Sequence, residues 1–192
     1  MNFSILAAGP LMAVALLATT APVAAAEPAP VPRAAIPAPD PAPDSAAALS
    51  ISPGSGVIQI RNGRSGKCLE IENSSTADGA QAQQWDCVGQ SSSYWRLEYA
   101  FGNNWEVRIV NNRSGKCLDV SNSSTADGAR VQQWSCANVG GQRWQVINTS
   151  GRDHVIRNVH SDKYLEIENS STANGANAQL WRKAGQSGMY WY

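Results

Sequence analysis

A segment of 19 residues occurs three times in this chain without a gap. Its copies lie at residues 67–85, 116–134 and 163–181. The first and second copies agree at 14 of 19 positions, and the first and third agree at 15 of 19. A unit of this size cannot bury its apolar face alone, so the three copies are expected to share one core. A surface site built from repeated residues is then expected to occur up to three times.

Apolar and polar residues alternate within each copy, a pattern typical of half-buried strands. In the second copy, Leu118 and Val120 alternate with Asp119, and the pair Asp127-Gly128 supplies a turn before the next strand. Each copy is therefore predicted to contain an antiparallel pair of strands. The residues expected to point into the core are Leu69, Ile71, Leu118, Val120, Leu165 and Ile167.

Further strands are predicted on both sides of each segment, and no stretch has a convincing helical period. These flanking strands are predicted at residues 57–61 and 94–99, 106–110 and 143–147, and 154–159 and 189–192. The chain is thus expected to be all-β, with twelve strands in three four-stranded repeats and no substantial helix. Three tryptophans lie eight residues after the second cysteine position of each copy and are assigned to the shared core: Trp95, Trp144 and Trp191.

The four cysteines stand as Cys68 and Cys87 in the first copy and as Cys117 and Cys136 in the second. Four cysteines allow three connectivities, but the repeat favours one disulfide within each copy because both copies must solve the same geometry. Zinc binding is the competing interpretation. It is disfavoured because no Cys-x-x-Cys pair occurs and neither histidine lies at ligand spacing, so we expect no metal and no cofactor.

The cysteines also predict which residues face each other across the paired strands. If Cys117 lies opposite Cys136, residues whose numbers sum to 253 are neighbours, and Asp119 faces Trp134. The same rule pairs Glu70 with Trp85 and Glu166 with Trp181. Each copy is therefore expected to place a carboxylate beside an indole on an outward face.

The chain begins with a predicted export signal at residues 1–26. A mostly apolar stretch at 5–18 is followed by small residues that end at Ala26, as expected of a cleavage site. The alternative is a membrane anchor, which needs about 20 apolar residues, and here Gly9 and Pro10 interrupt the run. We therefore expect a secreted protein without membrane insertion after signal cleavage.

Residues 27–54 hold eight of the ten prolines, alternating with alanine, and are interpreted as a semi-rigid linker. The folded domain is predicted at 55–192, with repeats at about 55–101, 102–150 and 151–192. The formal net charge of the chain is zero, and no basic cluster occurs. This balance argues against nucleic acid as a partner.

Three copies of four strands, a Cys-Leu-acid opening and a Gln-x-Trp closing together resemble the ricin B-type lectin family. The resemblance covers about residues 55–192 and implies a β-trefoil fold. It also implies a shallow sugar pocket in each copy. An acid just after the first cysteine accepts hydrogen bonds from sugar hydroxyls, and an aromatic residue just before the second cysteine stacks on the sugar. A Gln two residues before that aromatic residue and a later Asn-Gln pair complete the polar rim.

The second copy matches this implied pocket best, although it has Gly141 in place of the Asn. The implied sugar-binding residues are Asp119, Gln132, Trp134 and Gln142 in the second copy, Glu70, Gln83 and Trp85 in the first, and Glu166, Gln179 and Trp181 in the third. The first and third copies lack the Asn-Gln pair. A carboxylate beside an exposed indole suits sugar hydroxyls and C–H faces whatever the family. The alternative interpretation makes these tryptophans packing residues beside solvated acids.

The leading hypothesis is a secreted carbohydrate-binding lectin module without catalytic activity, with a glycan or polysaccharide as ligand. The alternative is a protein-interaction trefoil, either a protease inhibitor or a targeting subunit of a larger assembly whose partner protein is unknown. An enzyme is disfavoured because no Gly-x-Ser-x-Gly or His-Glu-x-x-His motif occurs. The acid pairs Glu70 and Glu72, or Glu166 and Glu168, are expected to be strand neighbours without a cleft rather than a glycosidase dyad.

Overall fold

The computed structural model describes residues 53–54 and 56–192. The predicted signal at 1–26 and nearly all of the predicted linker at 27–54 lie outside the described residues. The described chain forms twelve strands, six short 3-10 turns and no α-helix. The strands are β1 (Ile58–Gln59), β2 (Cys68–Ile71), β3 (Ala82–Trp85), β4 (Tyr94–Tyr99), β5 (Val107–Asn111), β6 (Cys117–Val120), β7 (Val131–Trp134), β8 (Trp144–Ser150), β9 (Asp153–Asn158), β10 (Lys163–Ile167), β11 (Ala178–Trp181) and β12 (Tyr190–Trp191). Among the described residues, no helix is long and apolar enough to cross a membrane.

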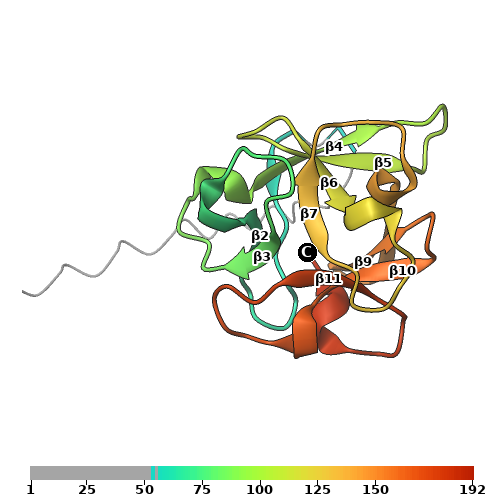
Figure 1. The fold of residues 1–192 in the computed structure, drawn as a ribbon. Coiled ribbons are helices and arrows are strands. Elements are labelled where there is room, and N and C mark those ends of the chain that lie inside the picture. Colours follow the sequence, from blue (N-terminus) through green and yellow to red (C-terminus); the bar gives the residue numbers. More distant parts are fainter. Residues whose placement is uncertain (1–52, 55) are drawn as a thin grey trace, which may run out of the picture. The chain divides into compact units, whose positions relative to one another are not determined.

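The strands are organised as three four-stranded units, β1–β4, β5–β8 and β9–β12. In each unit the two middle strands form an antiparallel hairpin: β2 with β3, β6 with β7, and β10 with β11. The outer strands join one unit to the next, since β4 pairs with β5 and β8 with β9. Backbone hydrogen bonds between Arg61 and Tyr192, at 2.8 and 2.9 Å, connect the last unit back to the first. Figure 1 shows the three hairpins arranged around one centre, and the predicted β-trefoil is confirmed.

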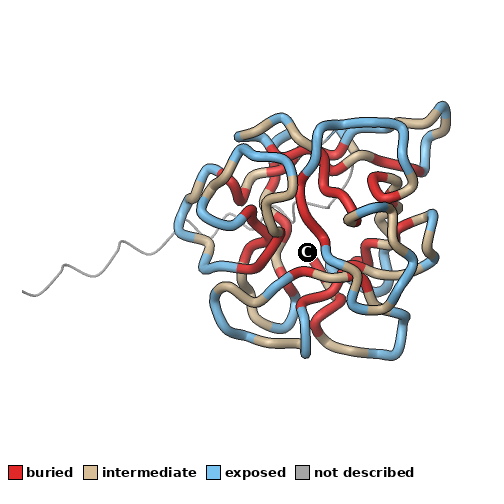
Figure 2. The backbone as a smooth tube through the Cα atoms, in the orientation of Figure 1, coloured by how far each residue is buried: buried red, intermediate tan, exposed pale blue. Residues whose placement is uncertain are grey.

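The three units share one apolar core, which is buried beneath exposed connecting loops (Figure 2). Its largest side chains are Trp95, Trp144 and Trp191, all fully buried as predicted. Each indole N–H donates a hydrogen bond, at 2.9 to 3.1 Å, to the carbonyl of the leucine after the first cysteine position, namely Leu69, Leu118 and Leu165. A buried indole therefore keeps its polar group paired in every unit. The inward leucine, isoleucine and valine positions predicted from the alternation are all buried.

Both predicted disulfides are present. Cys68 bonds to Cys87 and Cys117 bonds to Cys136, with Cα atoms 5.2 and 5.1 Å apart. In the third unit, Lys183 Nζ instead lies 5.7 Å from the ring centroid of Tyr164.

The strand register predicted from the cysteines is wrong by two residues. Cys117 lies opposite Trp134, and Asp119 lies opposite Gln132 rather than Trp134. The same correction places Glu70 opposite Gln83 and Glu166 opposite Gln179. The physical reason is that β7 ends at Trp134, so the disulfide reaches from a strand to the loop beyond the next strand. Because side chains alternate with a period of two, the shift keeps acid and indole on one face.

Candidate functional site

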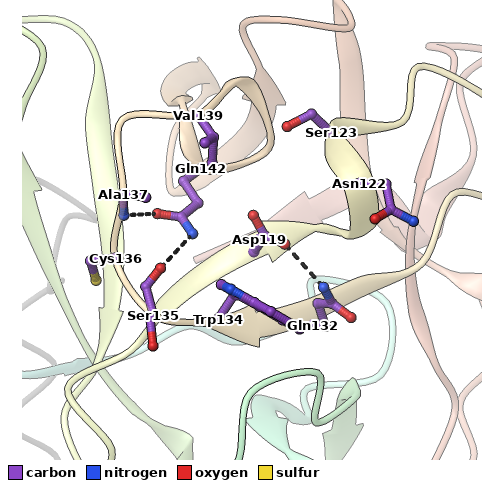
Figure 3. A pocket seen from close by; sticks show the side chains of 10 residues that line it. All are labelled: Asp119, Asn122, Ser123, Gln132, Trp134, Ser135, Cys136, Ala137, Val139 and Gln142. Atoms are coloured by element: carbon purple, nitrogen blue, oxygen red, sulfur yellow. Dashed lines mark hydrogen bonds between the residues drawn. The ribbon is translucent and has the colours of Figure 1, made fainter.

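A pocket of about 340 Å³ opens in the second unit, on the face of β6 and β7 that points away from the apolar core (Figure 3). It contains all four residues that the sequence assigned to this copy. Its lining residues are Asp119, Asn122, Ser123, Gln132, Trp134, Ser135, Cys136, Ala137, Val139 and Gln142. The pocket therefore lies where the repeated acid, glutamine and tryptophan come together.

Asp119 is the acid of this pocket, and it is only 6% exposed. Gln132, its cross-strand neighbour, donates a hydrogen bond from Nε2 to Asp119 Oδ2 at 3.1 Å. Burial raises the pKa of Asp119. The amides of Gln132 and Gln142 oppose that rise, and the negative charge of Asp78 adds to it. The carboxylate on the predicted outward face is thus held in a poorly hydrated position, where its negative charge is costly.

Trp134 forms the exposed wall of the pocket, with 46% of its surface accessible. Its ring lies against Gly79 of the first unit, where an added Cβ would stand 3.6 Å from Cζ3. Gly79 has a φ of +82°, a conformation that glycine adopts without strain. The indole ring therefore lies close to the backbone of the neighbouring unit.

Gln142 lines the pocket but supports a loop with its amide. It is fully buried, and Oε1 accepts a hydrogen bond from the backbone N–H of Ala137 at 2.8 Å. Its Nε2 donates to the backbone carbonyl of Ser135 at 3.1 Å (Figure 3). The rim position implied by the resemblance is thus occupied by a glutamine that fixes residues 135–137.

The other two units make the same pair of hydrogen bonds with a glutamine three residues earlier in the repeat. Gln90 accepts from the N–H of Val88 at 3.2 Å and donates to the carbonyl of Asp86 at 2.9 Å. Gln186 makes the equivalent bonds in the third unit, at 2.9 and 3.4 Å. The second unit has Val139 at this earlier position, 41% exposed and lining the pocket. In the second unit the glutamine that supports the loop therefore stands at position 142. An apolar residue, Val139, stands where the other two units have their loop-supporting glutamine.

Gly141 determines how deeply the pocket reaches beside Asp119. A Cβ at this position would stand 2.5 Å from the carbonyl oxygen of Val120 and 3.0 Å from Asp119 Oδ1. The backbone N–H of Gly141 donates to Ser123 Oγ at 2.8 Å. The glycine that replaces the implied Asn is thus required by close packing against β6.

In the first unit both oxygens of the acid already have protein partners. Gln83 donates to Glu70 Oε1 at 3.0 Å, and the hydroxyl of Ser92 donates to Oε2 at 3.3 Å. Ser92 Oγ also lies 3.1 Å from Ser74 Oγ. Trp85 is exposed as in the second unit. The structure thus brings Glu70, Gln83 and Trp85 together, but internal hydrogen bonds occupy the carboxylate.

In the third unit the acid is buried with one oxygen unpaired. Gln179 donates to Glu166 Oε1 at 2.9 Å, whereas Oε2 is buried without a hydrogen-bond partner. Burial raises the pKa of Glu166; Gln179 opposes the rise and the charge of Asp127 adds to it. Met189, fully buried, stands at the position equivalent to Gln142, and Trp181 is half-buried. The three predicted residues again lie together, but an apolar side chain replaces the polar one behind them.

The neighbouring unit also positions the pocket of the second unit. Asp78 of the first unit accepts hydrogen bonds from Ser135, at 2.7 Å from its N–H and 2.9 Å from its hydroxyl. It also pairs with Lys116 Nζ at 2.7 Å. Equivalent contacts join Asp127 to Lys163 and Arg182 at the next junction. Each site is therefore completed by a loop of the preceding unit.

Sequence reasoning missed Asn122, Ser123, Ser135, Ala137 and Val139 as pocket residues. Asn122 and Ser123 belong to the repeated Asn-Ser-Ser, and both have a positive φ, 54° and 49°. The turn that recurs at this place in every repeat is the sequence signal from which these two residues could have been predicted. Val139 could have been found by aligning the three copies, because it replaces a glutamine there.

No group of three or more His, Cys, Asp or Glu side chains suited to a metal ion occurs in the described part of the chain. The residues that line the pocket supply one carboxylate, amides, hydroxyls and an indole.

The model of the ricin-type beta-trefoil lectin domain-like family matches residues 48–134 and 100–181. A solved structure that resembles this chain is the designed three-fold symmetric protein ThreeFoil, with 35% identity and a TM-score of 0.68. The match covers 71% of this chain and 96% of that one. No curated protein matches the chain.

Two natural proteins show related structures. An exo-beta-1,3-galactanase from Clostridium thermocellum is 29% identical with a TM-score of 0.69; the match covers 73% of this chain but 30% of that chain. The Macrolepiota procera ricin B-like lectin, solved in complex with lactose, is 16% identical with a TM-score of 0.62. That match covers 74% of this chain and 96% of the lectin, and at this identity it shows the shared fold.

Proposed function

Since the chain belongs to the ricin-type β-trefoil lectin domain-like family, we propose that it is a secreted carbohydrate-binding module without catalytic activity. Its principal site is the pocket of the second unit. The observation that carries the proposal is a buried carboxylate, Asp119, beside the exposed indole of Trp134 in a cavity of about 340 Å³. A glycan or polysaccharide is the proposed ligand.

The two faces of this pocket suit the two kinds of surface that a sugar presents. Sugar hydroxyls donate hydrogen bonds, and a buried carboxylate accepts them more strongly than a neutral group does. The apolar C–H face of the ring packs on an aromatic side chain, here Trp134. Val139 supplies a second apolar contact on the opposite loop. Such a pocket favours a single sugar unit held at one edge by Asp119 and on one face by Trp134.

The pocket favours binding over hydrolysis because it contains one acid. Glycosidases commonly use two carboxyl groups about 5 to 9.5 Å apart across the scissile bond. Among the pocket residues only Asp119 carries a carboxylate. The match to the galactanase covers 30% of that enzyme chain, so most of the enzyme has no counterpart in this similarity.

Secretion is part of the proposal and rests on the predicted signal at 1–26. Shallow single pockets usually bind weakly, so useful strength would come from several sites engaging one polymer or surface. The acids and indoles of the first and third units, Glu70 with Trp85 and Glu166 with Trp181, are proposed as weaker contacts of this kind.

The test is a glycan array probed with the full secreted chain, followed by titration of the best glycan. Asp119→Asn keeps the shape but removes the charge, and we expect affinity to fall about 10- to 100-fold, as for loss of charge-assisted hydrogen bonds. Glu70→Gln is the matched comparison, and a much smaller loss of affinity is expected because the carboxylate of Glu70 already accepts hydrogen bonds from Gln83 and Ser92. Absence of any glycan signal, or equal affinity for wild type and Asp119→Asn, would favour the protein-interaction alternative.

A further inference from the structure

Arg108 carries a positive charge next to a residue that lines the pocket in the second unit. It lies on β5, and its Nη2 donates to the backbone carbonyl of Ala137 at 3.5 Å. Ala137 is itself a pocket residue. Arg108 is partly exposed and is not itself among the residues that line the pocket.

The charge of Arg108 is not neutralised by the described residues around it. Its cross-strand neighbour Glu98 pairs with Arg96 at 3.3 Å instead. The nearby Glu106 forms a two-point ion pair with Arg143, at 2.6 and 2.7 Å. No salt bridge to Arg108 occurs in the described chain, and its Nε is buried without a hydrogen-bond partner.

The guanidinium is also held in place by an aromatic ring. The Cζ atom of Arg108 lies 4.9 Å from the ring centroid of Phe101, within the range of a cation–π contact. Arg143 lies 5.1 Å from the same ring. A planar guanidinium fixed in this way loses little conformational freedom when it binds an anion.

Arg108 occurs only in the unit that has the pocket. The equivalent position is Gln59 in the first unit and the buried Val155 in the third. Gln59 donates to Ser93 Oγ at 3.2 Å, and Ser93 is the equivalent of Gln142. This position on the strand is thus adjacent to the sugar site in another unit as well, but an unpaired cation stands there in the second unit alone.

We propose that Arg108 forms an anion-binding subsite next to the pocket, so that the second unit prefers glycans with an acidic group beside the sugar held by Asp119. The inference rests on the proposed carbohydrate binding. A carboxylate and a sulfate both offer the paired oxygens that a guanidinium binds with two parallel hydrogen bonds. Arg108 reaches the ligand past Ala137, on the side of the pocket formed by the 135–139 loop.

The experiment compares matched glycans on the full chain. An array presents each neutral oligosaccharide beside its sulfated form and its sialic- or uronic-acid form, and the best set is titrated by calorimetry. For wild type we expect about tenfold tighter binding of an acidic member than of its neutral parent. This preference should weaken with added salt, since ions screen the exposed charge. Preference for one acid type alone identifies which of the two anions is the ligand.

Arg108→Gln should remove the acidic preference and leave the affinity for neutral glycans unchanged. Arg108→Lys keeps the charge without the planar guanidinium and should retain part of the preference. This variant therefore distinguishes loss of the charge from a folding defect in Arg108→Gln. Arg152→Gln removes the same charge at a distant exposed hairpin and should change nothing. Neutral glycans bound without an acidic preference, or a preference that survives Arg108→Gln, would overturn the subsite. Absence of all glycan binding would instead overturn the proposed function.

Discussion

The second and first units place an acid, a glutamine and a tryptophan on equivalent strands, yet the serine that donates to the acid in the first unit has no counterpart in the second. In the first unit Ser92 donates to Glu70, and Gln90 occupies the rim. In the second unit Gly141 replaces that serine, and Val139 replaces that glutamine. Residues outside the repeated segment therefore decide whether the repeated residues can act on a ligand.

The third unit differs from the second in the surroundings of its acid. Met189 stands fully buried at the position equivalent to Gln142, and Glu166 Oε2 is buried without a partner. This unit also lacks the disulfide that ties the strand to the following loop in the other two. The three copies of one segment thus give three different arrangements. The second unit has a pocket, the acid of the first unit has hydrogen bonds to both oxygens, and the acid of the third unit is buried with one oxygen unpaired.

The largest effect is expected from removing the disulfide that distinguishes the second unit from the third. Cys117→Ala with Cys136→Ala should lower the free energy of unfolding by about 3 kcal/mol, as the chain-entropy model gives for a loop of this length. Glycan affinity should fall too, because Cys136 lines the pocket. Denaturant unfolding and glycan titration measure the two effects.

The control is Cys68→Ala with Cys87→Ala, which opens the equivalent loop of the first unit. Its stability loss should be similar, but glycan affinity at the second unit should be kept. Equal losses of affinity in both double variants would show that the disulfide supports the whole fold rather than the local pocket.

The next effect concerns the exchanged glutamine. Val139→Gln with Gln142→Ser gives the second unit the arrangement of the first, where the half-buried Gln90 supports the loop. Stability should change little because the loop hydrogen bonds re-form, while affinity should fall about tenfold, roughly 1.4 kcal/mol, as the apolar wall is lost. Thermal unfolding and titration separate the two quantities.

The single variant Gln142→Ser tests whether the loop needs a supporting glutamine. It removes the amide that holds Ser135 and Ala137 without replacing it, so both stability and affinity should fall. If the double variant proved as unstable as the single one, the interpretation of Gln90 and Gln142 as equivalent supports would be wrong.

Much of the fold could be predicted from the sequence because the core repeats and alternates. The inward residues, the three buried tryptophans and both disulfides follow from period and spacing alone. The register could not be predicted in the same way. It was anchored on Cys117 and Cys136 as a facing pair, but Cys136 lies beyond the end of its strand, and the spacing does not reveal where a strand stops.

The site was predictable in its repeated part and not in its loops. Asp119, Gln132 and Trp134 recur with fixed spacing, and the structure places them in one pocket. The role of Gln142 was not visible because its partners are backbone groups of Ser135 and Ala137, which leave no mark on residue type. A hydrogen bond to the main chain can be supplied from more than one position, as the exchange with position 139 demonstrates.

A smaller effect is expected from pH. Burial raises the pKa of Asp119 above 3.8, so the folded protein binds this proton more readily than the unfolded chain does. As pH falls through the raised pKa, glycan affinity should decline because the charged acceptor is lost. Over the same range, down to about pH 3.8, Asp119 should add to the stability of the fold, since protonation removes the cost of a buried charge.

The difference between wild type and Asp119→Asn isolates this contribution. Asp78, Asp86 and Asp127 have lowered pKa values through their lysine or other hydrogen-bond partners, and they lose their stabilising contributions in acid in both proteins. Unfolding free energies measured from pH 7 to pH 4 should therefore converge between the two proteins at low pH. Parallel curves would show that the Asp119 carboxyl has an ordinary pKa.

The smallest effect should come from the junction between the first and second units. Asp78→Asn weakens the contacts to Ser135 and Lys116, and the cost in stability should be small because solvent screens an ion pair near the surface. Because Ser135 follows the exposed Trp134 and lines the pocket, we expect a loss of affinity of twofold to fivefold at the second unit. Asp127→Asn removes the equivalent contacts at the third unit and should leave that affinity unchanged, although its cost in stability should be similar. Equal affinity losses in the two variants would mean that the junctions act through overall stability, and the pocket of the second unit would then not depend on its neighbour for its shape.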